Sequence, residues 1–198
     1  MVEAGIRPEG IRIVDRAGGF GDPSLVKLKD KRVAIIGTGA ASVQIVPQLA
    51  RWCKHVYVIQ RTPAAVDDRH QRKTDKGSFH KEAAGFKGWQ RERMRNFHEH
   101  FTLGEHPAVN LVDDGWTRAP GLVGLTGNPY GPKLPEQVPA YNANLVEIDT
   151  PRQNRVRARV DQQVRDPATA EKSKPWYPSW CKRSLFHDDY LQTFNKIM

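Results

Sequence analysis

The residues best suited to chemistry are a glycine-rich turn near residue 40 and a basic pair far downstream. Gly37-Thr38-Gly39-Ala40-Ala41-Ser42 matches the pattern G-x-G-x-x-small. The first glycine of this pattern permits a tight turn, and the second lets a pyrophosphate approach the backbone. A helix that begins here presents unpaired N–H groups and about half a positive charge to the phosphates. The turn therefore predicts a dinucleotide site, to which we also assign Gln44 in the expected helix.

The elements that must position this turn form a βαβ pattern. Val33–Ile36 is an apolar run typical of a strand buried on both faces. Apolar residues at helical spacing predict a helix over residues 40–52, with Pro47 inside it, and the β-branched and aromatic run His55–Ile59 predicts a second strand. A bare G-x-G also occurs in tight turns that bind nothing, but its place within such a unit favours a nucleotide.

The end of the second expected strand indicates which dinucleotide is bound. An NAD site carries an acidic residue here to bind the ribose hydroxyls, whereas this chain reads Gln60-Arg61-Thr62. The Arg61 guanidinium can hold the 2′-phosphate of NADPH, with the Thr62 hydroxyl and the Gln60 amide as supporting donors. NADP(H) is therefore the expected cofactor, and a solvated surface arginine is the alternative for Arg61.

The rest of the chain predicts an α/β fold: an incomplete Rossmann-like NADP-binding domain with a mostly helical insertion. We expect a linker or remnant over 1–28, the NADP-binding domain over 29–66 and 173–198, and the insertion over 67–172. No strand is expected after Pro63 or near the end of the chain. The region 107–139 is rich in Gly and Pro and predicts loops.

Two helices are expected within the insertion. The first presents one apolar face, and the second begins with Thr150 as N-cap and Pro151 at the first helical position. The second helix carries valines every four residues as an inward stripe, and its arginines are expected to be exposed. The first helix's apolar residues are Trp89, Met94, Phe97 and Phe101; the second helix's valines are Val156, Val160 and Val164, and its arginines are Arg152, Arg155, Arg157, Arg159 and Arg165.

The amino-acid composition limits the classes of ligand and partner that we expect for this chain. The chain has 198 residues and a net charge of +9, which favours anionic partners such as phosphate-bearing cofactors, nucleic acid or a membrane surface. Because the basic helix has an ordinary inward stripe and no long apolar run occurs, we expect neither nucleic acid nor membrane as partner. Two distant cysteines and the histidine spacing give no zinc or other metal site. A cytoplasmic location is the default expectation.

Two segments of the chain resemble the Baeyer-Villiger type of flavin-containing monooxygenases. They are Arg32–Pro63, which carries the glycine turn and Gln-Arg-Thr, and Lys174–Asn195, which carries Lys182-Arg183; Val164–Glu171 supports the match. In that family NADPH reduces bound FAD, and an oxygen atom is then inserted beside a ketone carbonyl. The resemblance implies that Lys182 joins Arg61 at the 2′-phosphate. It also implies that Arg183 is catalytic, reaching flavin and nicotinamide and stabilising an anion. An ordinary basic surface pair is the alternative for these two residues.

The family's FAD-binding motif sets a limit on this resemblance. It is expected well over a hundred residues before the NADPH turn, where this sequence has few, and the fingerprint F-x-G-x-x-x-H-x-x-x-W is missing. We therefore expect the chain to bind NADPH but not FAD, and to be inactive alone unless another chain supplies the FAD domain. The alternative is a non-catalytic NADP(H)-binding module or a degraded remnant.

Overall fold

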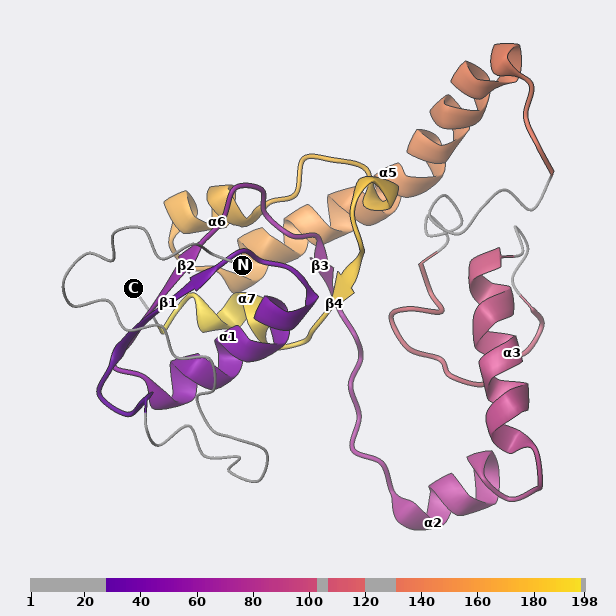
Figure 1. The fold of residues 1–198 in the computed structure, drawn as a ribbon, viewed down its shortest axis with the longest axis horizontal. Coiled ribbons are helices and arrows are strands. Elements are labelled where there is room, and N and C mark those ends of the chain that lie inside the picture. The colour runs from indigo at the N-terminus through magenta and orange to yellow at the C-terminus, as the bar shows by residue number, and fades with distance from the viewer. Residues whose placement is uncertain (1–27, 103–106, 120–130, 197–198) are drawn as a thin grey trace, which may run out of the picture.

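A computed structural model of the protein describes residues 28–102, 107–119 and 131–196. Almost all of the expected linker over 1–28 and part of the loop-rich middle lie outside these residues. Figure 1 shows three groups of elements: a small parallel sheet with helices on one side, a long helix, and a separate helical arm.

The βαβ unit is present as predicted. Strand β1 (Arg32–Ile36) is followed by helix α1 (Ala40–Trp52), which contains Pro47, and by strand β2 (His55–Ile59). The two strands pair in parallel, with Arg32 opposite His55 and Ile36 opposite Ile59. Parallel strands end at the same edge of a sheet, so the turn after β1 and the residues after β2 lie together.

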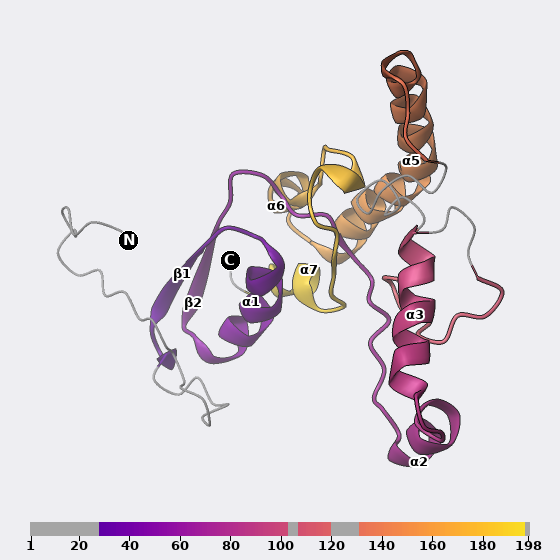
Figure 2. The same ribbon diagram turned by 45° about the vertical axis from the view of Figure 1, so that its right-hand side comes forward.

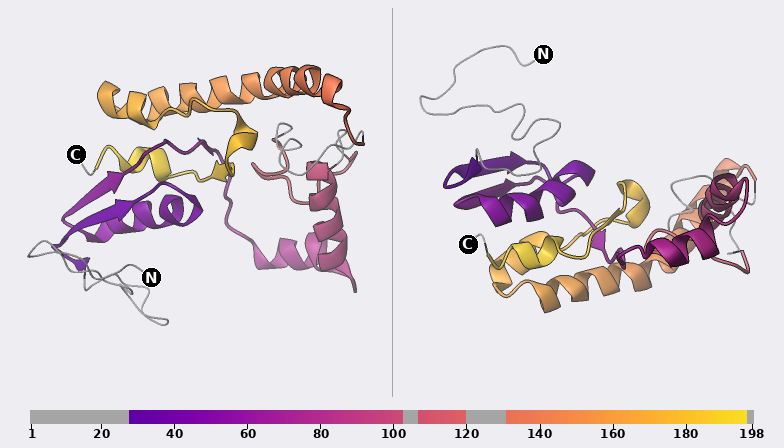
Figure 3. Two further views of the ribbon diagram at one scale, coloured as in Figure 1. Left: turned by 45° about the horizontal axis from the view of Figure 1, so that its top comes forward. Right: turned by 90° about the horizontal axis from the view of Figure 1, so that it is seen from below.

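The sheet is covered on one face only within the described residues. Val33, Ile35 and Val58 pack against the core around α1, whereas Ile36 on the other face is 82% exposed. This outcome corrects the expectation that Val33–Ile36 is buried on both faces. Helix α7 (Tyr190–Thr193) packs on α1, and α5 lies beyond it (Figure 3). The core is formed where these layers meet, around Val46, Leu191 and Val160.

A second small parallel sheet corrects the expectation that no further strand occurs. Strand β3 (Val66–Asp67) pairs with β4 (Leu185–Phe186). Two-residue strands are too short to show an alternating pattern. They form here because the two segments, more than a hundred residues apart, are held side by side by helix α5.

Helix α5 (Val138–Gln163) follows the 3-10 turn η4 (Pro135–Gln137) and begins well before the predicted start. The N-cap predicted at Thr150 is wrong, because Thr150 lies inside the helix and its hydroxyl donates back to the Val146 carbonyl at 2.7 Å. The sequence signal failed since Thr-Pro suits a helix start and is also tolerated inside a long helix. The valine stripe is confirmed: Val156 and Val160 are buried almost completely.

Helix α6 (Pro167–Ser173) follows α5 directly. The Asp166 carboxylate caps it by accepting from the Thr169 amide at 2.7 Å. The 3-10 turn η5 (Ser179–Cys181) then leads into β4. Helix α5 ends at Gln163, shortly before Asp166-Pro167, and α6 is a further helix that the sequence analysis does not predict.

The helical arm contains α2 (Lys76–Ser78), the π-helical turn η2 (Phe79–Ala83) and α3 (Trp89–Thr102). Figure 2 shows this arm apart from the sheet. The predicted helix around residues 89–101 is confirmed, but its apolar face is wrong in part because Met94 is 66% exposed. The buried residue Asn96 instead binds the following loop through the Val109 carbonyl and the Leu111 amide. Within the described residues, no helix has the length and apolar character needed to cross a membrane.

Candidate functional site

The glycine turn has the geometry that its sequence predicts. Gly37 has φ of +93°, a conformation that side chains disfavour, and its amide donates to the Ile59 carbonyl at 2.7 Å. Gly39 caps α1 without a side chain, and a Cβ placed there would meet no atom within 4 Å. The space next to Gly39 is therefore open to a ligand, at the end of a helix whose first amides are unpaired.

A cleft of about 670 Å³ lies at this end of the sheet. Most of the predicted site residues line it: Gly37, Thr38, Gly39 and Ala40 from the turn, Gln60, Arg61 and Thr62 from the end of β2, and Lys182 and Arg183 after η5. The Thr38 hydroxyl donates to the Thr62 carbonyl at 3.3 Å, which joins the first two groups. Segments more than a hundred residues apart thus converge on one cleft.

Three predicted residues do not line the cleft. Ala41 and Ser42 lie in the first turn of α1, just beyond the lining. The Gln44 amide donates to the Ala40 carbonyl at 3.0 Å, and its side chain lines a neighbouring groove beside Arg69. The structure therefore separates Gln44 from the residues that the turn and β2 bring together.

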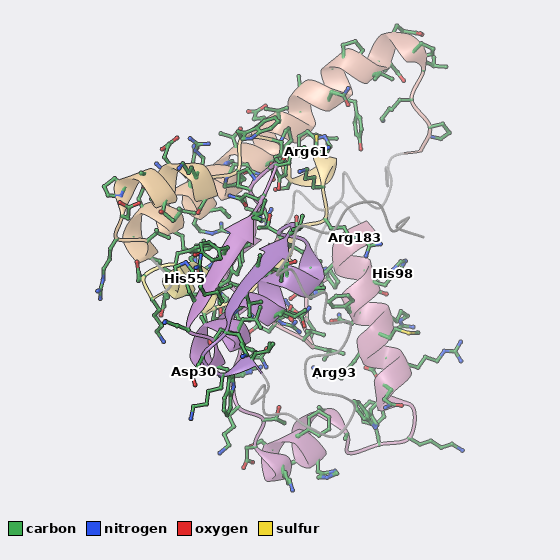
Figure 4. The ribbon with its side chains drawn as sticks, turned by 60° about the vertical axis from the view of Figure 1, so that its left-hand side comes forward. Asp30, His55, Arg61, Arg93, His98 and Arg183 are labelled. Carbon is green, nitrogen blue, oxygen red and sulfur yellow. The ribbon has the colours of Figure 1, made fainter. Side chains whose placement is uncertain are left out.

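The cleft is strongly cationic. Arg61, Lys182 and Arg183 all line it with exposed side chains, and among the residues that the structure describes no Asp or Glu lines it. Figure 4 labels Arg61 and Arg183 near the end toward which both strands run. Guanidinium and ammonium groups around open backbone amides suit a ligand with several phosphates.

Tyr177 joins the two cationic segments. Its hydroxyl donates to the Pro63 carbonyl at 2.9 Å and accepts from the Ala65 amide at 3.2 Å. The Lys182 ammonium lies 4.9 Å from the centre of its ring. Burial raises the pKa of the Tyr177 phenol, so it remains a neutral hydrogen-bond donor. The Tyr177 side chain is 7% exposed, whereas its neighbour Trp176 is 71% exposed.

Gln60 also connects distant segments. Its amide nitrogen donates to the Lys172 carbonyl at 2.8 Å, which fastens the end of β2 to α6. In this structure Gln60 therefore orients the chain beside Arg61, in addition to facing the cleft.

The arginines of α5 were expected to be exposed, and for two of them this is wrong. Arg152 and Arg159 are only 3% and 4% exposed. The Arg152 guanidinium pairs with the Asp67 carboxylate at 3.1 Å. Arg159 donates to the Val66, His187 and Asp188 carbonyls, each at about 3 Å. A helical charge pattern cannot distinguish a solvated arginine from one whose acceptors lie far away in the sequence.

The parallel βαβ unit, its open glycine turn and its cationic cleft together form a site suited to a ligand that carries phosphates. No protein-family model matches the chain. Three curated relatives are similar to nearly all of it. The polycyclic ketone monooxygenase of Thermothelomyces thermophilus is 47% identical over 178 residues, covering 88% of this chain and 27% of the relative. An FAD-binding monooxygenase of Penicillium brasilianum is 47% identical, covering 90% and 27%. A Baeyer-Villiger monooxygenase of Stachybotrys chlorohalonatus is 46% identical, covering 90% and 28%.

Solved structures agree with these relatives. The polycyclic ketone monooxygenase from Thermothelomyces thermophila superposes with a TM-score of 0.81 at 46% identity, covering 90% of this chain and 29% of that one. OTEMO in complex with FAD and NADP has a TM-score of 0.56 at 26% identity, covering 91% and 33%. The chain belongs, as a segment, to the FAD-binding Baeyer-Villiger monooxygenases. It spans about a quarter of the length of these curated relatives.

Proposed function

We propose that this chain provides the NADPH-binding part of an FAD-dependent monooxygenase of the Baeyer-Villiger type. The observation that carries the proposal is the convergence of the glycine turn, Arg61 and the Lys182-Arg183 pair on one cleft. No Asp or Glu from the described part of the chain lines this cleft. The relatives support it, since one of the similar structures holds both FAD and NADP.

The chain's own residues offer a partner to both phosphate-bearing parts of NADPH. The amides after Gly37 and the open space at Gly39 receive the pyrophosphate. Arg61 and Lys182 hold the 2′-phosphate, with the Thr62 hydroxyl as a further donor. One charge-assisted contact of this kind contributes about 1.5–3 kcal/mol, which corresponds to roughly a ten- to hundredfold preference for NADPH over NADH.

Arg183 is the residue of this chain that we assign to catalysis. When bound, NADPH supplies a hydride and FAD supplies the oxygen chemistry. Arg183 places a permanent positive charge at the cleft, where it stabilises negative charge that develops during the reaction. Because the chain spans about a quarter of its relatives, we assign the FAD and ketone sites to regions beyond it, in the same protein or in a complementing chain.

The test compares NADPH and NADH binding by calorimetry for the wild-type chain and for Arg61→Asp. We expect Arg61→Asp to weaken NADPH binding by about tenfold or more while changing NADH binding much less. Arg95→Asp on the separate arm makes the same charge change away from the cleft and serves as control. Equal losses for both dinucleotides, or an equal effect of the control, would remove the role assigned to Arg61.

An absorbance spectrum separates the proposal from its nearest alternative. We expect the purified chain to bind NADPH and to show no flavin absorbance at about 450 nm. This result fits an NADPH-binding part whose FAD site lies elsewhere. Co-purifying flavin would contradict that assignment. If addition of a complementing FAD domain produced no ketone oxidation, a non-catalytic NADP(H) module would be the better description.

A further inference from the structure

A buried polar cluster lies directly beneath the loop that carries Lys182 and Arg183. We call it the Arg152 cluster, and its members come from β3, α5, η5 and the position just before β4. They are Asp67, Asp149, Arg152, Gln153, Ser179 and Ser184. Five of them are almost fully buried, and only Gln153 is partly exposed. Burying this many polar groups reduces the stability of the fold unless they form hydrogen bonds with one another.

Arg152 is the centre of the cluster. Its Nε pairs with the Asp67 carboxylate at 3.1 Å, and its Nη1 donates to the hydroxyls of Ser179 and Ser184. Its guanidinium also lies over the Phe186 ring, 5.4 Å from the centre. Burial lowers the pKa of Arg152, and the Asp67 carboxylate opposes this effect. One planar side chain thus joins strand β3 to both ends of a loop.

The two serines are the residues that flank this loop. Ser179 is 0% exposed and Ser184 is 1% exposed, whereas Lys182 and Arg183 between them are exposed in the cleft. Ser179 is held twice more, because its amide donates to Asp149 at 2.8 Å and its hydroxyl accepts from Gln153 at 2.8 Å. A loop of four residues fixed at both ends has little freedom to move its side chains away from the cleft.

We propose that Arg152 is a positioning residue for the cleft: it fixes the loop between Ser179 and Ser184 and, through Lys182, sets the preference for a 2′-phosphate. The claim about the 2′-phosphate preference rests on the proposed function. The claim that Arg152 fixes the loop does not, because it concerns the chain without ligand.

Arg159 provides a matched control. It lies two turns further along the same face of α5 and is equally buried, but it binds the Val66, His187 and Asp188 carbonyls and neither serine. Substituting either arginine removes a buried guanidinium from the same helix. Only the Arg152 substitution releases the two serines.

The experiment uses Arg152→Met and Arg159→Met in the full chain. Asp67 keeps a partner in Arg152→Met because the Arg155 guanidinium also binds it at 2.7 Å, which favours folding of this variant. If Arg152→Met does not fold, Arg152→Lys retains the charge near Asp67 but cannot span from Asp67 to both serines. Circular dichroism establishes that each variant is folded before it is compared.

The first measurement is hydrogen exchange without ligand. We expect the amides of residues 179–185 to exchange faster in Arg152→Met, whereas in Arg159→Met the faster exchange is confined to residues near 66–68 and 187–188. Unchanged protection of 179–185 in folded Arg152→Met would overturn the proposal, whether or not the chain binds NADPH.

The second measurement is the ratio of NADPH to NADH affinity. We expect Arg152→Met to lower this ratio by about tenfold, and to change it less than about twofold in a chain that already carries Lys182→Ala. A full effect in the Lys182→Ala background, or an equal fall of the ratio in Arg159→Met, would show that Arg152 does not act through Lys182. If the wild-type chain showed no preference for NADPH, the proposed function would be refuted. The hydrogen-exchange result would then still test whether Arg152 orders the loop between Ser179 and Ser184.

Discussion

Asp67 is expected to contribute strongly to stability because its carboxylate pairs with a guanidinium inside the protein. Its side chain is 4% exposed and lies 3.1 Å from Arg152, whose side chain is 3% exposed, and 2.7 Å from Arg155, which is 57% exposed. Substitution Asp67→Asn keeps the size of the side chain and removes its charge. The buried Arg152 guanidinium then loses the carboxylate with which it pairs, at a cost of about 3–5 kcal/mol, and only the more distant charge of Asp149 still acts on it. The exposed Arg155 pair contributes at most about 1 kcal/mol.

Urea unfolding followed by tryptophan fluorescence measures this cost. With a slope of about 2 kcal/mol per M, the midpoint is expected to fall by roughly 2 M. Asp113→Asn is the control, because the Asp113–Arg118 pair is shorter, at 2.6 Å, but about half exposed, so its loss should cost at most about 1 kcal/mol. A similar shift for both substitutions would refute the view that burial, rather than distance, decides the strength of these pairs.

Four further predictions concern the turn and the elements around it. Gly37→Ala should destabilise the chain by about 1–2 kcal/mol in urea unfolding because its φ is +93°. Gly39→Ala should change stability by less than about 1 kcal/mol, yet weaken NADPH binding in calorimetry because its Cβ would occupy the open space beside the turn. Gly115→Ala should cost about 1–3 kcal/mol because a Cβ there would lie 2.1 Å from the Asp68 carbonyl oxygen. Burial acts to raise the pKa of Asp188, but hydrogen bonds from the Arg69, His70 and Gln71 amides outweigh it and lower the pKa. Its stabilisation is therefore complete above about pH 4 and is lost as pH falls through the lower folded-state pKa. Urea midpoints at about pH 7 and pH 3 should accordingly differ less for Asp188→Asn than for the wild type.

The βαβ unit could be predicted from the sequence because its signals are local. The glycine turn, the apolar run before it and the Gln60-Arg61-Thr62 end all lie within one stretch of chain, and each constrains its neighbours. The resemblance added Lys182 and Arg183, which no local pattern would have connected to the turn. The structure then brings the glycine turn, the end of β2 at Gln60-Arg61-Thr62 and the pair Lys182-Arg183 to the same cleft.

The remaining features could not be predicted because they depend on partners distant in sequence. Strands β3 and β4 have two residues each and exist only where α5 holds them together. Arg152 and Arg159 look like ordinary surface charges on a helix until their acceptors, which are distant in the sequence, are placed beside them. These acceptors include Asp67, Ser179 and the His187 carbonyl. The dipeptide Thr150-Pro151 is compatible both with a helix start and with a helix interior. It lies in the interior here because α5 begins at Val138.

Helix α5 is therefore part of the frame of the cleft, although it belongs to the segment expected to be an insertion. Arg61 follows β2 and lies a few residues before Asp67, while Lys182 lies between the two serines that Arg152 binds. Both cationic segments are thus fastened to one guanidinium on one helix, and Tyr177 joins them again from the other side through Pro63 and the Lys182 ammonium. A displacement of α5 along its axis would move both segments together. In the proposed function Arg61 and Lys182 hold one phosphate together, so the spacing between them matters. That spacing is set by Tyr177 in the cleft and by Arg152, which does not line it.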